Sequence, residues 1–219
     1  MTKMTIIDVF TLDECESIAT EVLKLDPYLI DRGCFYTLGA ATYQDSIATY
    51  PAIANAFNLI INGAFGLMHE RVNDKLAEHF NKPVGNMDSG VGLPSFHVFD
   101  SGSNGIQGHP HIDEPYTRVD FSMLEWDNPF SFTLPVSIPS AGAGVDFWWG
   151  CSDEEIDNYL FHGELPEPEY VPYKLGSMYV HDGKTPHRIA SIAPMPENET
   201  RITLQGHGVH VKDGIIVYF

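Results

Sequence analysis

Three side chains in the second half of the chain have the types and spacing that bind a metal ion. His111 and Asp113 lie two residues apart in the segment Gly108-His109-Pro110-His111-Ile112-Asp113-Glu114-Pro115. In an extended segment such residues point to the same side, so an imidazole and a carboxylate can reach one point. His187 follows much later, in Thr185-Pro186-His187-Arg188. Two imidazoles and one carboxylate on one face of a divalent ion leave positions open on the other face, where further ligands can bind.

The metal site has structural alternatives. A histidine pair with a nearby carboxylate arises easily by chance in a chain with 10 histidines, and single histidines are more often structural. Zn(II) accepts the same donor set as Fe(II). A binding protein that holds zinc without catalysis therefore stays open as an alternative.

A second group of polar residues follows in Arg201-Ile202-Thr203-Leu204-Gln205-Gly206-His207. In a strand, Arg201, Thr203, Gln205 and His207 share one face. A buried arginine is costly unless it is paired, and a guanidinium with a nearby hydroxyl is a good clamp for a carboxylate, which it binds through two hydrogen bonds. The alternative is a structural pair with one of the 30 acidic residues.

The first third of the chain is predicted to be helical. Thr11 and Glu14 have the spacing of a capping box, and Asp26-Pro27 ends this helix. A second helix is predicted from Pro51 to Asn81, with Gly63 and Gly66 as points where it can break. Its apolar residues recur at steps that are mostly three or four, as on one buried helix face: Ile53, Phe57, Ile60, Phe65, Met68, Val72, Leu76 and Phe80.

From about residue 92 the apolar residues alternate with a period of two, which indicates strands. Strands are expected at 130–138, 145–149 and 177–181, and a hairpin at 201–211 and 215–219 around Lys212-Asp213-Gly214. Pro135 indicates an edge strand or a bulge. Many short strands with Gly and Pro between them favour a sandwich or a jelly roll. Residues 151–173, with capping-box spacing at Ser152 and Glu155, are expected to form an acidic insertion with a short helix, either a lid or a solvated face.

His111-Ile112-Asp113, then His187, then Arg201-Ile202-Thr203, in this order on a β-rich half, resembles the Fe(II)/2-oxoglutarate-dependent oxygenase superfamily. The resemblance implies a mostly β fold with α, namely a double-stranded β-helix (jelly-roll) core buttressed by N-terminal helices. Residues 1–91 would be the helical buttress and residues 92–219 the catalytic core of the same domain. It also implies that His111, Asp113 and His187 bind Fe(II), and that Arg201 and Thr203 bind the distal carboxylate of the cosubstrate 2-oxoglutarate, with O2 as the oxidant.

Two further segments, Gly142–Trp148 and Gly206-His207-Gly208, are similar to the small branch of that superfamily that acts on free amino acids. This branch contains hydroxylases and halogenases, and in the halogenases the carboxylate ligand is replaced by Gly or Ala. Asp113 fills this position here. The resemblance therefore implies hydroxylation of an unactivated C–H bond in a small molecule, a free amino acid or a derivative.

Five residues near these motifs are candidates for substrate contact: His109, Glu114, Tyr116, Gln205 and His207. His109 shares the face of His111 if the strand continues through Pro110, and a surface role is its alternative. Trp148 and Trp149 are interpreted as structural, with one of them at the cavity mouth. His181 and Asp182, at an Asp-Gly turn, are interpreted as fold-related.

Composition limits the classes of partner. Lys plus Arg is 12 and Asp plus Glu is 30, a formal charge of −18. Few cations are available to neutralise nucleic-acid phosphates or to hold an anionic membrane surface, which disfavours both partners and an oxygenase acting on nucleic acid. The three cysteines are expected to be reduced thiols of a cytoplasmic protein, and no run of apolar residues is long enough to predict a membrane span. An oxygenase acting on a protein stays open as an alternative.

Overall fold

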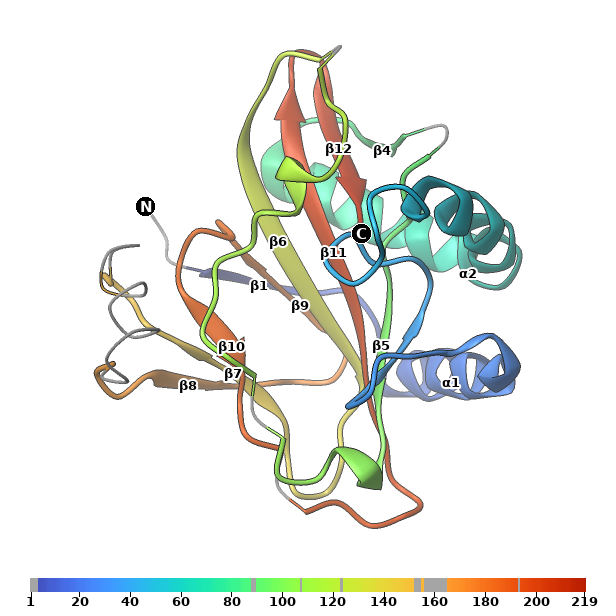
Figure 1. Ribbon diagram of the computed structural model, residues 1–219, viewed down its shortest axis with the longest axis vertical. Helices are drawn as coiled ribbons and strands as arrows, with labels where there is room; N and C mark the ends of the chain where they lie inside the picture. Colours follow the sequence, from blue (N-terminus) through green and yellow to red (C-terminus); the bar gives the residue numbers. More distant parts are fainter. Residues whose placement is uncertain are drawn as a thin grey trace.

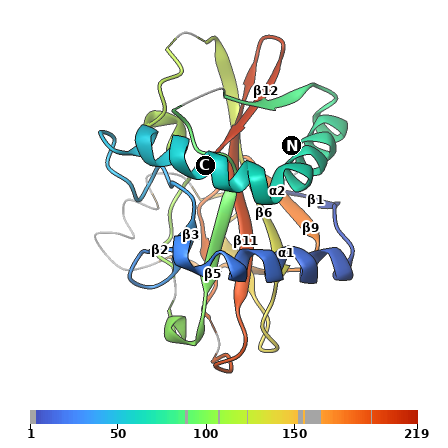
Figure 2. The ribbon, with the colours of Figure 1, turned by 90° about the vertical axis from the view of Figure 1, so that its right-hand side faces the viewer.

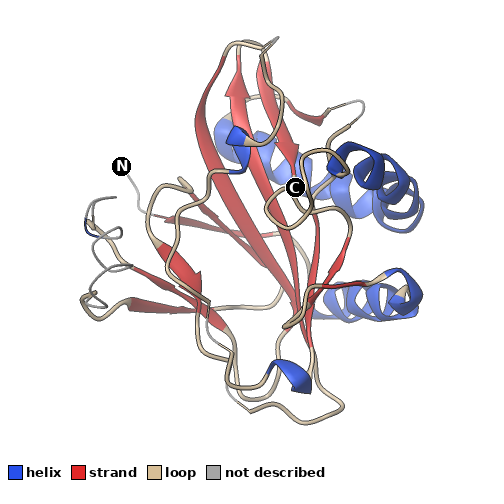
Figure 3. Ribbon diagram, in the orientation of Figure 1, coloured by secondary structure: helices blue, strands red, loops and turns tan. Residues whose placement is uncertain are grey.

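The computed structural model describes residues 4–87, 90–106, 108–122, 124–151, 155, 165–192 and 194–219. Its fold is mostly β, with two sheets and two long helices (Figures 1 and 3). The predicted capping box at Ser152 and most of the predicted insertion lie outside the described residues. Only its end is described, where Glu169–Pro172 forms strand β8.

The larger sheet has nine strands, with the order β1-β9-β6-β11-β5-β3-β2, while β12 pairs with both β11 and β4. These strands are β1 (Met4–Asp8), β2 (Ile30–Asp31), β3 (Tyr36–Leu38), β4 (Val84–Asn86), β5 (Ser95–Phe99), β6 (Trp126–Ser137), β9 (Ser177–His181), β11 (Arg201–Val211) and β12 (Gly214–Tyr218). The smaller sheet has the order β10-β7-β8, formed by His187–Ile189, Gly144–Phe147 and Glu169–Pro172. The predicted hairpin is confirmed, since Val211 pairs with Gly214 at the turn between β11 and β12.

Both long helices lie across the same face of the larger sheet (Figure 2). Helix α1 (Leu12–Lys24) begins at the predicted capping box, in which Thr11 Oγ1 accepts from the Glu14 amide and the Glu14 carboxylate accepts from the Thr11 amide. Helix α2 (Tyr50–Phe80) is kinked at Phe65, whose φ of −127° and ψ of 15° are not helical. The break therefore falls between the two glycines that predicted it, Gly63 and Gly66.

The main core lies between the helices and this face of the sheet. Alternate residues of the strands enter it, and Ile202 and Leu204 of β11 are fully buried there. By length and composition α2 is the one helix among the described residues that could cross a membrane, with a mean hydropathy of 1.3 over its most apolar window. Its residues Phe65, Met68, Val72 and Leu76, however, belong to the main core, so α2 packs as a helix of a folded domain.

The first third of the chain is less helical than predicted, because it also contributes strands. β1 pairs with β9, β3 pairs with β5, and β4 pairs with β12, all of which are remote in the chain. These strands have five residues or fewer, and a pattern of period two is hard to recognise over so short a length.

Pro135 lies in β6, which is an interior strand between β9 and β11. The register of β6 against β11 shifts at this point, since Ile202 pairs with Ser137 but Thr203 pairs with Pro135. Of the two predicted alternatives, edge strand or bulge, the structure thus has the bulge. A proline is tolerated there because the ladder is already interrupted.

His69 makes the stability of the fold dependent on pH. It is 5% exposed on α2, and burial lowers its pKa from 6.5 to about 4. The imidazole of His69 binds a proton more readily in the unfolded chain than in the folded one. The contribution of neutral His69 to the free energy of unfolding is therefore fully present above pH 6.5 and is lost as the pH falls towards 4. Urea unfolding at pH 7 and pH 4.5 should show that His69→Leu reduces this loss by about 2 kcal/mol. An unchanged pH dependence in the variant would contradict the assignment.

Candidate active site

A cavity of about 610 Å³ is lined by residues of both sheets. Ser131 and Thr133 of β6 and His207 of β11 come from the larger sheet, and Phe147 of β7 and His187 of β10 come from the smaller one. Since Ile202 and Leu204 of β11 fill the core on the helix side, the alternate residues of β11 face the cavity. The two sides of β11 therefore separate core packing from the residues with possible chemistry.

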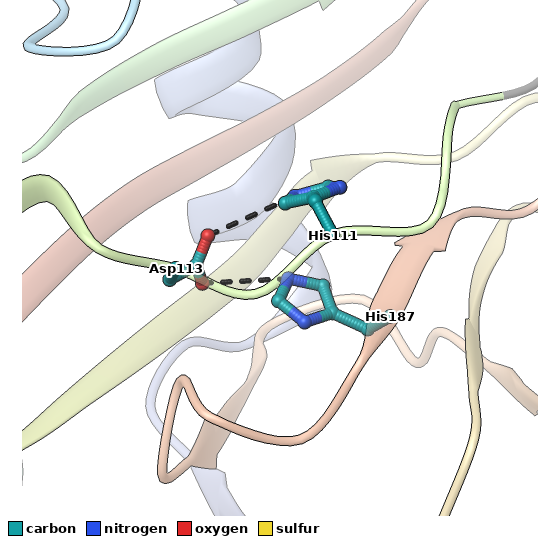
Figure 4. A group of neighbouring side chains, drawn as sticks. All are labelled: His111, Asp113 and His187. Atoms are coloured by element: carbon teal, nitrogen blue, oxygen red, sulfur yellow. Dashed lines mark ion pairs between the residues drawn. The ribbon is translucent and has the colours of Figure 1, made fainter. Parts of the chain in front are cut away.

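The structure brings His111, Asp113 and His187 together in this cavity (Figure 4). His187 Nε2 lies 3.3 Å from Asp113 Oδ2, and His111 Nε2 lies 3.7 Å from Asp113 Oδ1. One ligand atom of each residue lies within 4.8 Å of the others. Three donors this close together form a group that could hold one metal ion.

Backbone hydrogen bonds position the three side chains. His111 and His187 form an antiparallel bridge, in which each amide donates to the carbonyl of the other at 2.9 Å. The Asp113 amide donates to the Gly183 carbonyl at 2.7 Å, in the turn before β10. The pairing register between the segment around residue 111 and the segment around residue 187 therefore determines where the donor atoms lie.

The ring orientation of both histidines suits metal binding. Nδ1 of His111 lies 2.8 Å from the His109 carbonyl, and Nδ1 of His187 lies 2.9 Å from the Thr185 carbonyl. A carbonyl only accepts, so in each neutral ring the proton is on Nδ1 and the lone pair of Nε2 is directed to the common centre. Such outer hydrogen bonds orient histidine ligands in metal sites.

The charges of the three residues are strongly linked. Burial by itself would raise the pKa of Asp113, but the charge and hydrogen bond of His187 outweigh it and bring that pKa well below 3.8. Burial opposes protonation of His187, yet Asp113 raises its pKa above 6.5. Partial loss of hydration and the charge of His187 lower the pKa of His111, whose side chain is half exposed. A cation entering the site thus meets an ionised carboxylate and must displace at most a proton from His187.

Arg201 is a buried cation next to the same cavity. It is 1% exposed, its Nη2 donates to the Gly144 carbonyl at 3.4 Å, and its Nε has no hydrogen-bond partner. The guanidinium lies 5.2 Å from the ring centres of Phe99 and Tyr173. Within the described residues, no carboxylate forms an ion pair with it. The structural acid partner that was the alternative for Arg201 is therefore absent from this part of the chain, and the site can accept an anion.

Polar side chains connect Arg201 to the cavity. The Gln205 amide donates to Thr203 Oγ1 at 3.1 Å, and Thr133 donates to Gln205 Oε1 at 2.8 Å. The Tyr173 hydroxyl hydrogen-bonds with Thr133 and Arg201, and burial raises its pKa, so it stays protonated. Tyr173 was not predicted from sequence, because it lies on the connection after β8, where no motif marks it.

The predicted substrate-contact residues separate into two groups. His109, Gln205 and His207 line the cavity, and His207 Nδ1 lies 2.9 Å from Ser131 Oγ. Glu114 and Tyr116 do not line it. Tyr116 packs on Trp126 beside a separate apolar cluster, and its hydroxyl donates to Glu114 at 3.4 Å.

Two buried histidines of the cavity wall were missed or misinterpreted. His97 of β5 lines the cavity and is the cross-strand neighbour of Thr203 on β11. Burial lowers the pKa of His97 to about 3. His181 was interpreted as fold-related at the end of the strand predicted at 177–181; it does end β9, but it also lines the cavity, with its ring 4.7 Å from that of His187. The alternation in Ser95–Phe99 could have identified His97, whereas the place of His181 in the cavity wall depends on which strand β9 joins.

The two tryptophans have the structural contacts that were expected of them. Trp148 is buried and donates to the Pro166 carbonyl, while Trp149 stacks on Phe147 of the cavity wall.

A buried ion pair holds the loop that carries Tyr43 to the cavity. Arg32 binds both carboxylate oxygens of Asp45, at 2.8 and 3.1 Å, and Asp45 also accepts from the Ala41 amide. In urea unfolding, Asp45→Asn should cost about 3 kcal/mol, since it leaves the Arg32 charge buried and uncompensated. Glu78→Gln, which breaks an exposed pair with Lys75, should cost less than about 0.5 kcal/mol. Equal effects of the two variants would refute this role for the pair.

The chain has the fold of Fe(II)/2-oxoglutarate oxygenases. An N-substituted L-amino acid dioxygenase from Burkholderia ambifaria AMMD superposes with a TM-score of 0.61 and 16% identity, over 99% of this chain and 86% of that chain; it has also been solved in complex with alpha-KG. HygX from Streptomyces hygroscopicus, with nickel and 2-oxoglutarate bound, gives a TM-score of 0.56 and 12% identity over 94% and 82% of the two chains. A 2OG-Fe(II) oxygenase family oxidoreductase from Burkholderia pseudomallei superposes with a TM-score of 0.53 and 11% identity, over 97% of this chain and 86% of that chain. No protein-family model and no curated protein matches the chain.

Proposed function

We propose that this protein is an Fe(II)- and 2-oxoglutarate-dependent hydroxylase of an unactivated C–H bond in a small molecule, a free amino acid or a derivative. The observation that carries the proposal is a His-Asp-His donor group in the cavity together with a buried arginine beside that cavity, which has no carboxylate partner among the described residues. The shared fold supports it, and we propose that the two sheets form the double-stranded β-helix core of those oxygenases.

His111, Asp113 and His187 would hold Fe(II). Their donor set fits the ion, because it provides two imidazole lone pairs and one negative charge from a single side. Bound Fe(II) supplies O2 activation, driven by oxidative decarboxylation of 2-oxoglutarate. With Asp113 as a ligand, the position that the halogenases of the similar branch leave open for a halide would be filled, so the proposed reaction is hydroxylation.

Arg201 and Thr203 would bind the distal carboxylate of 2-oxoglutarate, and Tyr173 adds a hydroxyl donor beside them. The guanidinium is preorganised, because Phe99 and Tyr173 enclose it and its Nε is unused. A buried anion there satisfies a cation that is otherwise uncompensated. Orientation of the cosubstrate and exclusion of water are the contributions of these residues.

The substrate would bind in the rest of the cavity, near His109, Gln205 and His207. We propose a cytoplasmic enzyme with small-molecule substrates and no nucleic-acid or membrane partner. All three cysteines are free thiols, which suits a reducing compartment.

Anaerobic titration tests the proposal. Addition of Fe(II) and then 2-oxoglutarate should give a weak visible charge-transfer band, and admission of O2 with a panel of free amino acids should give succinate coupled to a product heavier by one oxygen atom. A protein that holds Zn(II) without catalysis would give neither signal. If the band forms but no amino acid supports coupled turnover, the oxygenase proposal stands and the amino-acid substrate is wrong.

A further inference from the structure

Five aromatic rings form a continuous wall on one side of the cavity. Phe35, Tyr43, His97, His207 and Phe219 all line it, and we call them the ring wall. The ring of His97 lies 4.8 Å from Phe35, 6.0 Å from Tyr43 and 5.4 Å from Phe219. The rings of His207 and Phe219 are parallel within 8° at 6.3 Å. None of the five is used for the proposed metal or for the 2-oxoglutarate carboxylate.

The ring wall offers no charged partner. No lysine or arginine lines the cavity among the described residues, and its one carboxylate is that of Asp113. The two histidines of the wall are neutral, since burial lowers the pKa of both His97 and His207. A carboxylate placed against the wall would lose its hydration without gaining a cation, which is costly.

An ammonium group is also disfavoured, although aromatic rings can bind cations. Asp113 is the one carboxylate among the described lining residues, and the proposed metal uses it, so the wall leaves a buried ammonium group without a counterion. Tyr43, which is 38% exposed and hydrogen-bonded to His97 Nε2, presents a ring surface that a ligand can cover.

We propose that the ring wall binds an uncharged aromatic or flat apolar group of the substrate, so that any charged ends lie towards the mouth of the cavity beside the exposed His109. This inference names the substrate class of the proposed oxygenase and rests on that function. Stacking against Tyr43 and Phe35 would orient this group, as offset or edge contacts between rings do elsewhere.

Three probes of similar shape and different charge test the inference: benzamide, benzoate and benzylammonium. Their binding is measured by ligand-observed NMR on the full chain loaded with Zn(II) and 2-oxoglutarate, in which no turnover occurs. Benzamide should bind at least about tenfold more tightly than either charged probe. Equal or tighter binding of benzoate or benzylammonium, or no binding of benzamide, would overturn the inference. Binding of 2-oxoglutarate in the same sample reports separately on the proposed function.

Two variants locate the probe. Tyr43→Ala should weaken benzamide binding by about fivefold, whereas Tyr43→Phe, which keeps the ring, should change it by less than twofold. Tyr28→Ala is the matched control, because Tyr28 is 50% exposed on the helical turn Asp26–Tyr28, which contributes no residue to the described cavity lining. If Tyr43→Ala binds benzamide as the unmodified chain does while its circular dichroism is unchanged, the ring wall is not the site.

Discussion

The Asp113→Asn variant should lose Fe(II) binding by at least about 100-fold and all turnover of 2-oxoglutarate with it. The substitution keeps the size of the side chain but removes the one negative charge among the three proposed ligands, and an amide oxygen is a poor replacement for a carboxylate on a divalent ion. It also replaces the ionised partner of His187, 3.3 Å away, with a neutral amide. Fe(II) affinity is measured by competition with a chelating dye, and turnover by succinate release.

A matched control separates this effect from general damage. His79→Asn changes an exposed histidine near the end of α2 and should leave both quantities unchanged. His187→Ala should behave as Asp113→Asn does. If Asp113→Asn kept full turnover with added Fe(II), Asp113 would not be a metal ligand, even though the fold resembles that of the oxygenases.

Replacement of Arg201 by lysine should raise the Kd for 2-oxoglutarate by about 100-fold while the affinity for the metal stays within about twofold. Lysine keeps the positive charge but cannot bind a carboxylate through two parallel hydrogen bonds, and it does not fill the space between Phe99 and Tyr173. Calorimetric titration of 2-oxoglutarate into the Zn(II)-loaded protein measures the first quantity, and the chelator competition measures the second.

Arg71→Lys is the control for this experiment, since Arg71 is half exposed on α2 and pairs with Glu14. It should leave 2-oxoglutarate binding unchanged. A variant with lysine at position 201 that binds 2-oxoglutarate normally would show that the cosubstrate carboxylate lies elsewhere. Loss of both metal and cosubstrate binding together with a lower melting temperature would show that Arg201 supports the fold instead.

Local sequence signals predicted the elements whose stability is mainly local. The capping box at Thr11, the helix ending at Asn81 and the hairpin around Asp213 are each encoded by a few neighbouring residues. The short strands β1 and β4 could not be predicted in this way, because their hydrogen bonds depend on remote partners, β9 and β12. No composition within five residues specifies such a partner.

The candidate site was predicted to the extent that its residues share a strand face or a motif. The spacing of His111 and Asp113, and the common face of Arg201 and Thr203, are properties of single segments. Glu114 was placed near the substrate because it follows the motif, but the chain turns after Asp113 into Pro115–Thr117, a helical turn that carries it away from the cavity. The cavity positions of His97 and Tyr43 depend on which strands become neighbours, which no single segment specifies.

The antiparallel bridge between His111 and His187 has a consequence for how such a protein can diversify. Two main-chain hydrogen bonds join these residues directly, so the long polypeptide loop between them is closed at its base. A change of length in a connection between strands of that stretch, such as the one that joins β7 (Gly144–Phe147) to β8 (Glu169–Pro172), is therefore compatible with unchanged positions of the two imidazoles. Under the proposed function, such a connection can vary in length while the chelating group is kept.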